Sequence, residues 1–353
     1  MEHIGIDLGA MHSHVVVISS AGELKARLRL RTPELPQWLL SREPSRVVME
    51  ACTQSPAMAR IAIEARHETK VVPGNLLRAL GVGARGIKTD DRDAEVLARA
   101  SLRNQELPSV HLRSESSRSR REVISTRALL VENRKSIVLS VKSWLRGELI
   151  HLKGRAQPAS FHKTVCAAVL TRPGGLPLAI KIALQTYDQL THQIGELDKL
   201  VEQLVDNDSV CTRLQTIPGV GPHTALAFTT HIDDPTRFAS SEHLASYLAL
   251  VPGEATTGGK LKRTGTIKAG PKYLKALLVQ SAWAMWRTRG NDPLVVWARA
   301  IADKRGKRVA VLALARKIAT IMWSCWKHET SYDPTKAARA RLTVEEPSIL
   351  PKA

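Results

Sequence analysis

Short apolar runs and helical patterns alternate through the first hundred residues. Apolar runs of strand length occupy residues 3–9, 14–19, 24–30, 46–50 and 70–72, and patterns typical of helices occupy 33–40, 56–65 and 88–103. The first three strands follow one another through tight turns, which predicts an antiparallel meander. Helices separate the later strands. The order predicts an α/β domain in which helices cover a mixed sheet.

Helical patterns dominate the rest of the chain. An apolar stripe predicts a helix over residues 123–149, and from Ile180 to Leu204 apolar residues recur at alternating spacings of three and four. Nearly four heptads of this kind predict a coiled coil, either as a hairpin with the 123–149 helix or between two copies of the chain. Later helices are predicted over 273–287, 294–304 and 308–326. Five of the seven tryptophans lie in them, at a helical spacing that favours a core role over base stacking.

These patterns divide the chain of 353 residues into four parts, of which the larger ones are long enough to have their own cores. The parts are an α/β domain over 1–112, a helical coiled-coil dimerisation region over 113–208, a small helical C-terminal domain over 209–330, and a tail over 331–353 that we expect to be disordered.

The charge balance indicates a polyanionic partner. Lys and Arg number 52 against 33 Asp and Glu, which gives a formal net charge of +19 and a pI near 10.1. Nucleic acid is the first candidate. A membrane surface is not expected, because neither end carries an isolated basic amphipathic segment. The apolar stretch 309–326 contains Arg316 and Lys317 at its centre, which predicts a buried helix instead.

Cysteine usage and the N-terminus indicate a reducing compartment. The cysteines, Cys52, Cys166, Cys211 and Cys325, form no C-x-x-C pair, which argues against a structural zinc site and a disulfide framework. The first residues lack the pattern of a secretory signal. We therefore expect a bacterial-type cytoplasmic protein associated with the nucleoid.

Four acids end predicted elements of the first domain. Asp7 and Glu50 end two apolar strands, and Asp90 and Asp93 lie three residues apart at the start of the 88–103 helix. Side chains at strand ends meet at one edge of an α/β sheet, and residues three apart share a helix face. Thr89 is also a good N-cap, so acids that only stabilise the first helical turn are an open alternative for Asp90 and Asp93.

Four neighbouring carboxylates repel one another unless divalent cations neutralise them. An RNase H-like fold assembles acids in this way, and two Mg²⁺ held between them would activate a nucleophile and stabilise the leaving oxygen in phosphoryl transfer. The sequence therefore predicts Asp7, Glu50, Asp90 and Asp93 as ligands of a magnesium site.

Two segments of the C-terminal domain are candidates for nucleic-acid contact. The Ile-Pro-Gly-Val-Gly turn at residues 217–221 resembles a helix-hairpin-helix, in which backbone N–H groups of Gly219 and Gly221 would approach a phosphate. Any tight helix-helix turn could use the same glycines. Residues 252–270 form a loop rich in Gly, Thr and Lys, expected either as a solvated flexible loop or as one that orders on nucleic acid. Its candidate contacts are Gly258, Lys260, Lys262, Arg263 and Lys268.

These motifs together resemble one known family. Asp7 in Gly-Ile-Asp-Leu-Gly, Glu50 in Met-Glu-Ala, and Lys-Thr-Asp-Asp-Arg-Asp-Ala at 88–94 are similar to the DEDD transposases of insertion sequences, to which a pilin-gene invertase is related. Ile-Pro-Gly-Val-Gly-Pro, Arg237-Phe238 and the run 247–253 resemble the second region of that family. The likeness spans residues 3–104 and 212–326, with the heptad segment as the spacer.

The resemblance implies a RuvC-like nuclease domain, magnesium, dimers that form a tetramer on DNA, and in some members a bridge RNA that selects the DNA sites. The four acids carry over, with Asp91 as a residue between ligands. The family has a nucleophilic serine just before the glycine of the basic loop, whereas this chain has Thr257. The hydroxyl of threonine could attack, although its extra methyl group crowds the approach.

The same residues allow alternatives to a transposase. Gly-Ile-Asp-Leu-Gly also begins sugar kinases and actin-like ATPases, but their second phosphate strand and adenosine motif are not found in the sequence. A RuvC-like Holliday-junction resolvase would use the same acids with water, without need of the heptad segment or the C-terminal domain. A catalytically impaired nucleic-acid-binding scaffold is the alternative that Thr257 leaves open.

Overall fold

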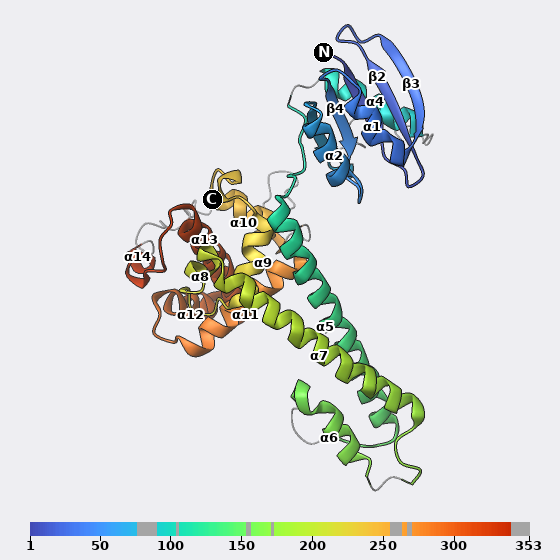
Figure 1. Ribbon diagram of the computed structural model, residues 1–353. Helices are drawn as coiled ribbons and strands as arrows, with labels where there is room; N and C mark the ends of the chain where they lie inside the picture. Colours follow the sequence, from blue (N-terminus) through green and yellow to red (C-terminus); the bar gives the residue numbers. More distant parts are fainter. Residues whose placement is uncertain are drawn as a thin grey trace, which may run out of the picture. The chain divides into compact units, whose positions relative to one another are not determined.

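A computed structural model describes residues 1–75, 90–103, 106–152, 157–170, 173–254, 263–266 and 270–339. The chain divides into two compact units, Met1–Leu112 and Arg113–Ala353, drawn from blue to teal and from green to red in Figure 1. The finer division of the second unit, expected from the sequence at residues 208 and 330, stays a prediction.

The first unit contains a mixed five-stranded sheet with the strand order β3-β2-β1-β4-β5. Its strands are β1 (His3–Asp7), β2 (His12–Ile18), β3 (Leu24–Arg31), β4 (Arg46–Glu50) and β5 (Glu68–Val72). The first three pair antiparallel, whereas β1 and β4, and then β4 and β5, pair parallel. The predicted α/β class, with an initial meander and helices between the later strands, is confirmed.

Helices cover both faces of this sheet. The helices α1 (Leu35–Leu40) and α2 (Ser55–Glu64) pack on one face, against Ile4, Ile6, Val47 and Met49. The helix α4 (Asp90–Arg103) packs on the other, where Ala94 and Ala98 meet Val16 and Ile18, and Leu97 meets Val48. Because successive residues of a strand point to opposite faces, Asp7 shares the α4 face with Gly5, and Glu50 shares it with Val48.

In the part of the second unit that the structure describes, the elements are helices and one small hairpin. Its helices are α5 (Glu115–Gly147), α6 (Phe161–Ala168), α7 (Leu178–Asp206), α8 (Ser209–Leu214), α9 (Pro222–Ile232), α10 (Ser241–Tyr247), α11 (Lys272–Thr288), α12 (Pro293–Arg305), α13 (Lys307–Lys327) and α14 (Pro334–Arg339). The strands β6 (Pro252–Glu254) and β7 (Arg263–Thr266) pair antiparallel, so the predicted loop over 252–270 contains strand at both ends of its central connection.

The long helices α5 and α7 pack side by side within the chain (Figure 1). On α7 the residues Tyr187, Ile194 and Val201, each seven apart, are buried, and the other members of the heptad pattern are at least half-buried. Of the two arrangements expected for this segment, the structure contains the hairpin. Coiled-coil geometry and contact between two copies stay predictions.

The helix α13 and the tail bear on two expectations from the sequence. Among the described residues α13 is the one helix long and apolar enough to cross a membrane by length and composition, yet Leu314, Ile318 and Met322 are fully buried in the core of the unit. This is the buried helix that the sequence predicts. Of the tail, the structure describes residues 331–339, where Tyr332 packs on the core and Asp333 caps α14 by accepting from the Thr335 N–H at 2.8 Å. Residues 340–353 lie outside the described residues, and disorder of the tail stays a prediction.

Candidate active site and nucleic-acid contacts

Asp7 and Glu50 end two neighbouring parallel strands. The paired residues of β1 and β4 run from His3 with Arg46 to Ile6 with Met49, so the next step sets Asp7 beside Glu50. Both side chains are partly exposed. They share one face of the sheet, since the residues before them, Ile6 and Met49, belong to the core on the opposite face. The two carboxylates thus leave one edge of the sheet in one direction.

The helix α4 crosses this face antiparallel to β1. Near the starts of the strands, Ser101 at the end of α4 makes a 2.8 Å hydrogen bond with His3 Nδ1 and accepts one of 2.9 Å from Arg46 at its carbonyl. In the middle, a Cβ added to Gly5 would lie 2.0 Å from the carbonyl oxygen of Ala94. The start of α4, which carries Asp90 and the buried Asp93, therefore lies at the edge where β1 and β4 end.

The donor chemistry of this edge suits a hard divalent cation, because carboxylate oxygens are the ligands that Mg²⁺ prefers. Among the side chains that the structure describes, however, no three from His, Cys, Asp or Glu lie close enough together to hold a metal ion. The side chain of Asp90 lies outside that described set. The topology thus directs Asp7, Glu50 and Asp93 to one edge without closing a ligand shell.

Two neighbours of these acids were not anticipated from the sequence. His14 is the cross-strand partner of Asp7 in the β1–β2 pair and occupies the α4 face by alternation. Gly74 follows β5, and a Cβ at this position would lie 2.5 Å from Glu50 Oε1. The antiparallel register of the meander could have identified His14. A single glycine after a proline carries no comparable signal, because only the folded chain brings it to Glu50.

The predicted glycine turn connects α8 to α9, and its two glycines differ. Gly219 has φ +87°, and an added Cβ would lie 2.4 Å from the Ser281 carbonyl oxygen of α11, so its own packing requires glycine. Gly221 is the N-cap of α9 in extended conformation, with nothing within 4 Å of an added Cβ. Among the described residues, packing therefore explains why position 219 is glycine but does not explain why position 221 is glycine.

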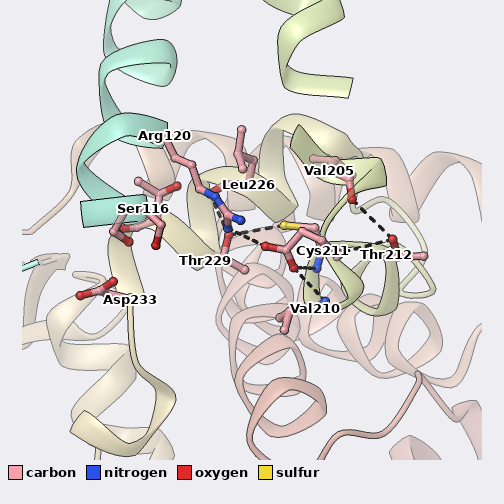
Figure 2. Close-up of polar contacts among 12 residues, drawn as sticks. Ser116, Arg120, Val205, Val210, Cys211, Thr212, Leu226, Thr229 and Asp233 are labelled. Atoms are coloured by element: carbon pink, nitrogen blue, oxygen red, sulfur yellow. Dashed lines mark hydrogen bonds and ion pairs between the residues drawn. The ribbon is translucent and has the colours of Figure 1, made fainter. Parts of the chain in front are cut away.

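Polar contacts fix α8 ahead of this turn (Figure 2). The carboxylate of Asp208 accepts hydrogen bonds from the N–H groups of Val210 and Cys211 at 2.9 and 3.0 Å, and it pairs with Arg120 of α5 at 2.5 Å. Cys211 Sγ lies 3.5 Å from the Thr229 hydroxyl of α9. Burial raises the pKa of the Cys211 thiol to about 11, which keeps it protonated and unreactive.

A second network holds the start of α9. Asp198 of α7 accepts from Arg127 of α5, and its carboxylate lies 2.8 Å from His223 Nε2. Burial raises the pKa of Asp198, but hydrogen bonds and charge from Arg127 and His223 outweigh it and leave the pKa below its ordinary value. The three helices are thereby joined next to the glycine turn.

The predicted nucleophile and most of the predicted basic contacts lie outside the described residues. Thr257, Gly258, Lys260 and Lys262 belong to the segment 255–262 that connects β6 to β7, and Lys268 follows β7. Arg263 lies in β7, but its side chain is outside the described part. These assignments stay predictions.

Comparison with known proteins gives consistent similarities. A family model described as a transposase of the DEDD IS110 type matches residues 4–149, and one described as the transposase IS116/IS110/IS902 family matches residues 211–294. The first contains β1, β4 and α4, and the second contains the glycine turn and the β6–β7 hairpin.

Relatives extend over most of the chain. A "Probable family 20 transposase" of Pseudomonas aeruginosa is 28% identical over 345 residues, which cover 95% of this chain and 99% of the relative. The "Transposase for insertion sequence element IS1328" of Yersinia enterocolitica is 29% identical, over 91% and 95% of the two chains. A "Pilin gene-inverting protein" of Moraxella bovis is 29% identical over 148 residues, 41% of this chain and 44% of its own.

Proposed function

The chain belongs to the family of DEDD transposases of IS110-type insertion sequences, and from this premise we propose that it cuts and rejoins DNA strands at the ends of such an element. The observation that supports the proposal most is the common edge of Asp7, Glu50 and the start of α4, reached by residues far apart in the sequence. Carboxylates at one such edge can hold the divalent cations that assist phosphoryl transfer between DNA strands.

Asp7, Glu50, Asp90 and Asp93 would hold two Mg²⁺ in this proposal. When bound, the cations neutralise the acids and stabilise charge on the phosphate oxygens. The chain contributes the orientation of the ligands. Strand pairing fixes Asp7 beside Glu50, and the close contact at Gly5 fixes α4 above them. Gly74 leaves room for the Glu50 carboxylate, so that it can face the ligand edge.

Thr257 would supply the attacking oxygen from the β6–β7 connection. In the proposed step its Oγ forms a bond to a DNA phosphorus, the bond from that phosphorus to one sugar oxygen breaks, and the hydroxyl proton of Thr257 passes to the sugar oxygen that leaves. The phosphothreonine link conserves the energy of the broken bond. A sugar hydroxyl of a partner strand then attacks it and restores Thr257, so that joining requires no nucleotide cofactor.

The partners in this proposal are donor and target DNA, a bridge RNA, and further copies of the chain, as a dimer that becomes a tetramer on DNA. The excess of Lys and Arg supports a polyanionic partner. Thr257 at the serine position favours one second candidate, a scaffold that binds nucleic acid without catalysis.

Recombination of a plasmid that carries the element tests the proposal. We expect Asp7→Asn and Thr257→Ala to lower recombination by about a thousandfold or more, and Thr257→Ser to retain or raise it. The matched control is Asp91→Asn, which removes an acid from the same helical turn and should leave recombination within about threefold of wild type.

The outcomes separate the candidates. Recombination by Thr257→Ala but not by Asp7→Asn would remove the covalent step assigned to Thr257. Cut DNA without joined products would favour hydrolysis with water, as in a resolvase. Full activity in Asp7→Asn would overturn the catalytic proposal. If the wild type and Thr257→Ser both bind DNA and neither recombines it, the scaffold is favoured.

A further inference from the structure

Two tryptophans of the second unit stand partly exposed on α11. Trp283 and Trp286 are half-buried, with ring centroids 6.4 Å apart and planes inclined at 61°. Their helical spacing predicts a core role, and their inner edges do pack on the core of the unit. The contrast is Trp323 of α13, which is only 9% exposed and donates its indole N–H to the Pro235 carbonyl at 2.8 Å. The α11 rings are thus amphipathic surface groups rather than buried ones.

Exposed cations from two other helices lie over these rings. The ammonium of Lys307, from the first turn of α13, lies 5.4 Å from the Trp283 ring centre and 5.6 Å from that of Trp286. The guanidinium of Arg299, from α12, lies 5.9 Å from the Trp286 centre and packs against Gly290, where an added Cβ would lie 3.1 Å from it. We call Trp283, Trp286, Arg299 and Lys307 the tryptophan cluster.

The surroundings of the tryptophan cluster are strongly basic. The stretch 287–308 contains seven Lys and Arg, all exposed, and two acids, Asp292 and Asp303. Asp292 is already used, since it caps α12 and accepts from the Tyr332 hydroxyl at 3.1 Å. Neither Arg299 nor Lys307 pairs with an acid among the described residues. Like charges gathered without acids are most favourable when a polyanion is bound.

We propose that the tryptophan cluster binds unpaired nucleotides, with a base stacked on an indole face and Arg299 and Lys307 on the adjoining phosphates. Aromatic rings beside cations suit a single strand, because every base has a π-face, whereas a duplex buries the faces of its bases by stacking and presents phosphates, sugars and base edges. The inference takes from the proposed function only that the partner is nucleic acid. It assigns a third contact surface to a unit whose predicted contacts are the glycine turn and the basic hairpin.

Binding of a labelled oligonucleotide to the full-length protein tests the cluster. The probes are a fluorescein-labelled single strand of about 20 nucleotides, as RNA and as DNA, and a duplex DNA of the same sequence, measured by fluorescence anisotropy over a salt series. We expect Trp286→Leu, which keeps apolar bulk, to weaken single-strand binding about tenfold without changing the salt slope. Trp286→Phe should restore most of the affinity, and duplex binding should not change.

The cations should behave differently from the ring. Arg299→Gln with Lys307→Gln should reduce the slope of log affinity against log salt by about 1 to 2. The matched control is Lys327→Gln, because Lys327 lies 4.7 Å from the Trp323 ring centre, over an indole that is buried and hydrogen-bonded. It should leave the single-strand affinity unchanged. A greater loss with RNA than with DNA, or the reverse, identifies which strand the cluster serves.

Several outcomes would overturn the inference. The first is that Trp286→Leu binds the single strand as tightly as wild type does. The second is that Trp286→Leu loses affinity for duplex and single strand equally. The third is that Trp286→Phe melts as wild type does but does not recover single-strand affinity. Asp7→Asn, which removes recombination in the proposed function, leaves the cluster intact and should bind the single strand as wild type does. The experiments therefore distinguish failure of the tryptophan-cluster proposal from failure of the proposed catalytic function.

Discussion

The two units hold their candidate chemistry in different ways. In the first unit, strand pairing and a backbone contact at Gly5 bring the ends of β1 and β4 and the start of α4 to one edge. In the second unit, side-chain networks around Asp198 and Asp208 join helices next to the glycine turn. A site fixed by backbone contact has no tolerance for added volume, whereas one fixed by hydrogen bonds loses stability in smaller steps. Substitutions at the backbone contacts, Gly5 in the first unit and Gly219 in the second, should therefore cost more unfolding free energy than substitutions in the side-chain networks.

Gly5→Val should have the largest effect. An added Cβ would lie 2.0 Å from the Ala94 carbonyl oxygen and 2.5 Å from the Ala98 nitrogen, both backbone atoms that cannot move without shifting α4. We expect the free energy of unfolding of the first unit to fall by about 3 kcal/mol or more, and recombination to be lost with it. Thermal unfolding followed by circular dichroism of the full chain measures it.

The control is a glycine with open space around it. An added Cβ at Gly195, within α7, meets nothing within 4 Å, so Gly195→Ala should stabilise the second unit by about 0.5 to 1 kcal/mol. A Gly5→Val protein that melts as wild type does would mean that α4 is not held on the sheet by this contact.

Gly219→Ala should have the next largest effect, and the comparison with Gly221→Ala sharpens it. Gly219 combines φ +87° with a 2.4 Å approach to the Ser281 carbonyl, so we expect a loss of about 2 kcal/mol. Gly221→Ala should cost less, about 0.5 to 1 kcal/mol for a poorer N-cap, because its backbone is extended and its Cβ would meet open space. Urea unfolding compares the two.

Nucleic-acid affinity of the same variants tests the helix-hairpin-helix hypothesis. If Gly221→Ala retains its stability but binds duplex DNA more weakly, Gly221 meets a phosphate. If both variants bind DNA in proportion to their folded fraction, the turn is a packing element and the hypothesis is wrong.

Asp198→Asn should lower the free energy of unfolding by less than Gly219→Ala does, about 1 kcal/mol. The carboxylate of Asp198 is partly exposed, so solvent screens its ion pair. The pKa of Asp198 in the folded protein lies below its ordinary value of 3.8, so its stabilisation is complete above that value and is lost as the pH falls through the folded pKa. The difference in unfolding free energy between wild type and variant should therefore be constant near neutral pH and shrink in acid. A difference that grows on acidification would contradict this assignment.

Sequence periodicity predicted the two strands that end in Asp7 and Glu50, because the relevant signals are local. Apolar runs ending in Asp7 and Glu50, with the first three strands joined by short turns, fix the order of strands, and alternation then fixes the face. The antiparallel direction of α4 was not predictable in the same way. It depends on the contact of Gly5 with Ala94 and on His3 and Arg46 meeting Ser101, which are contacts between distant parts of the chain.

Elements with weak local signals were missed in the second unit. The strands β6 and β7 are only three and four residues long, lie among Gly, Thr and Lys, and carry no alternation. The helix α14 is six residues long and depends on the cap by Asp333 and on packing with α12. The surface position of Trp283 and Trp286 was missed for another reason, because helical spacing specifies a face but not what covers it.

The smallest effect is expected for chemical modification of the Cys211 thiol, and the rate of this modification tests whether the two units fold separately. Cys52, in the first unit, is exposed, whereas Cys211, in the second, is fully buried with a pKa raised by burial from 9.0 to about 11. At pH values near 9 its thiolate fraction is about a hundredth even before access is considered, so iodoacetamide should modify Cys52 and leave Cys211 intact, with reaction at Cys211 rising only towards pH 11. The same protection should persist in Gly5→Val if damage stays within the first unit. Rapid modification of Cys211 in that variant, detected by mass spectrometry of its peptide, would mean that the second unit depends on the first and that the two units form one cooperative fold.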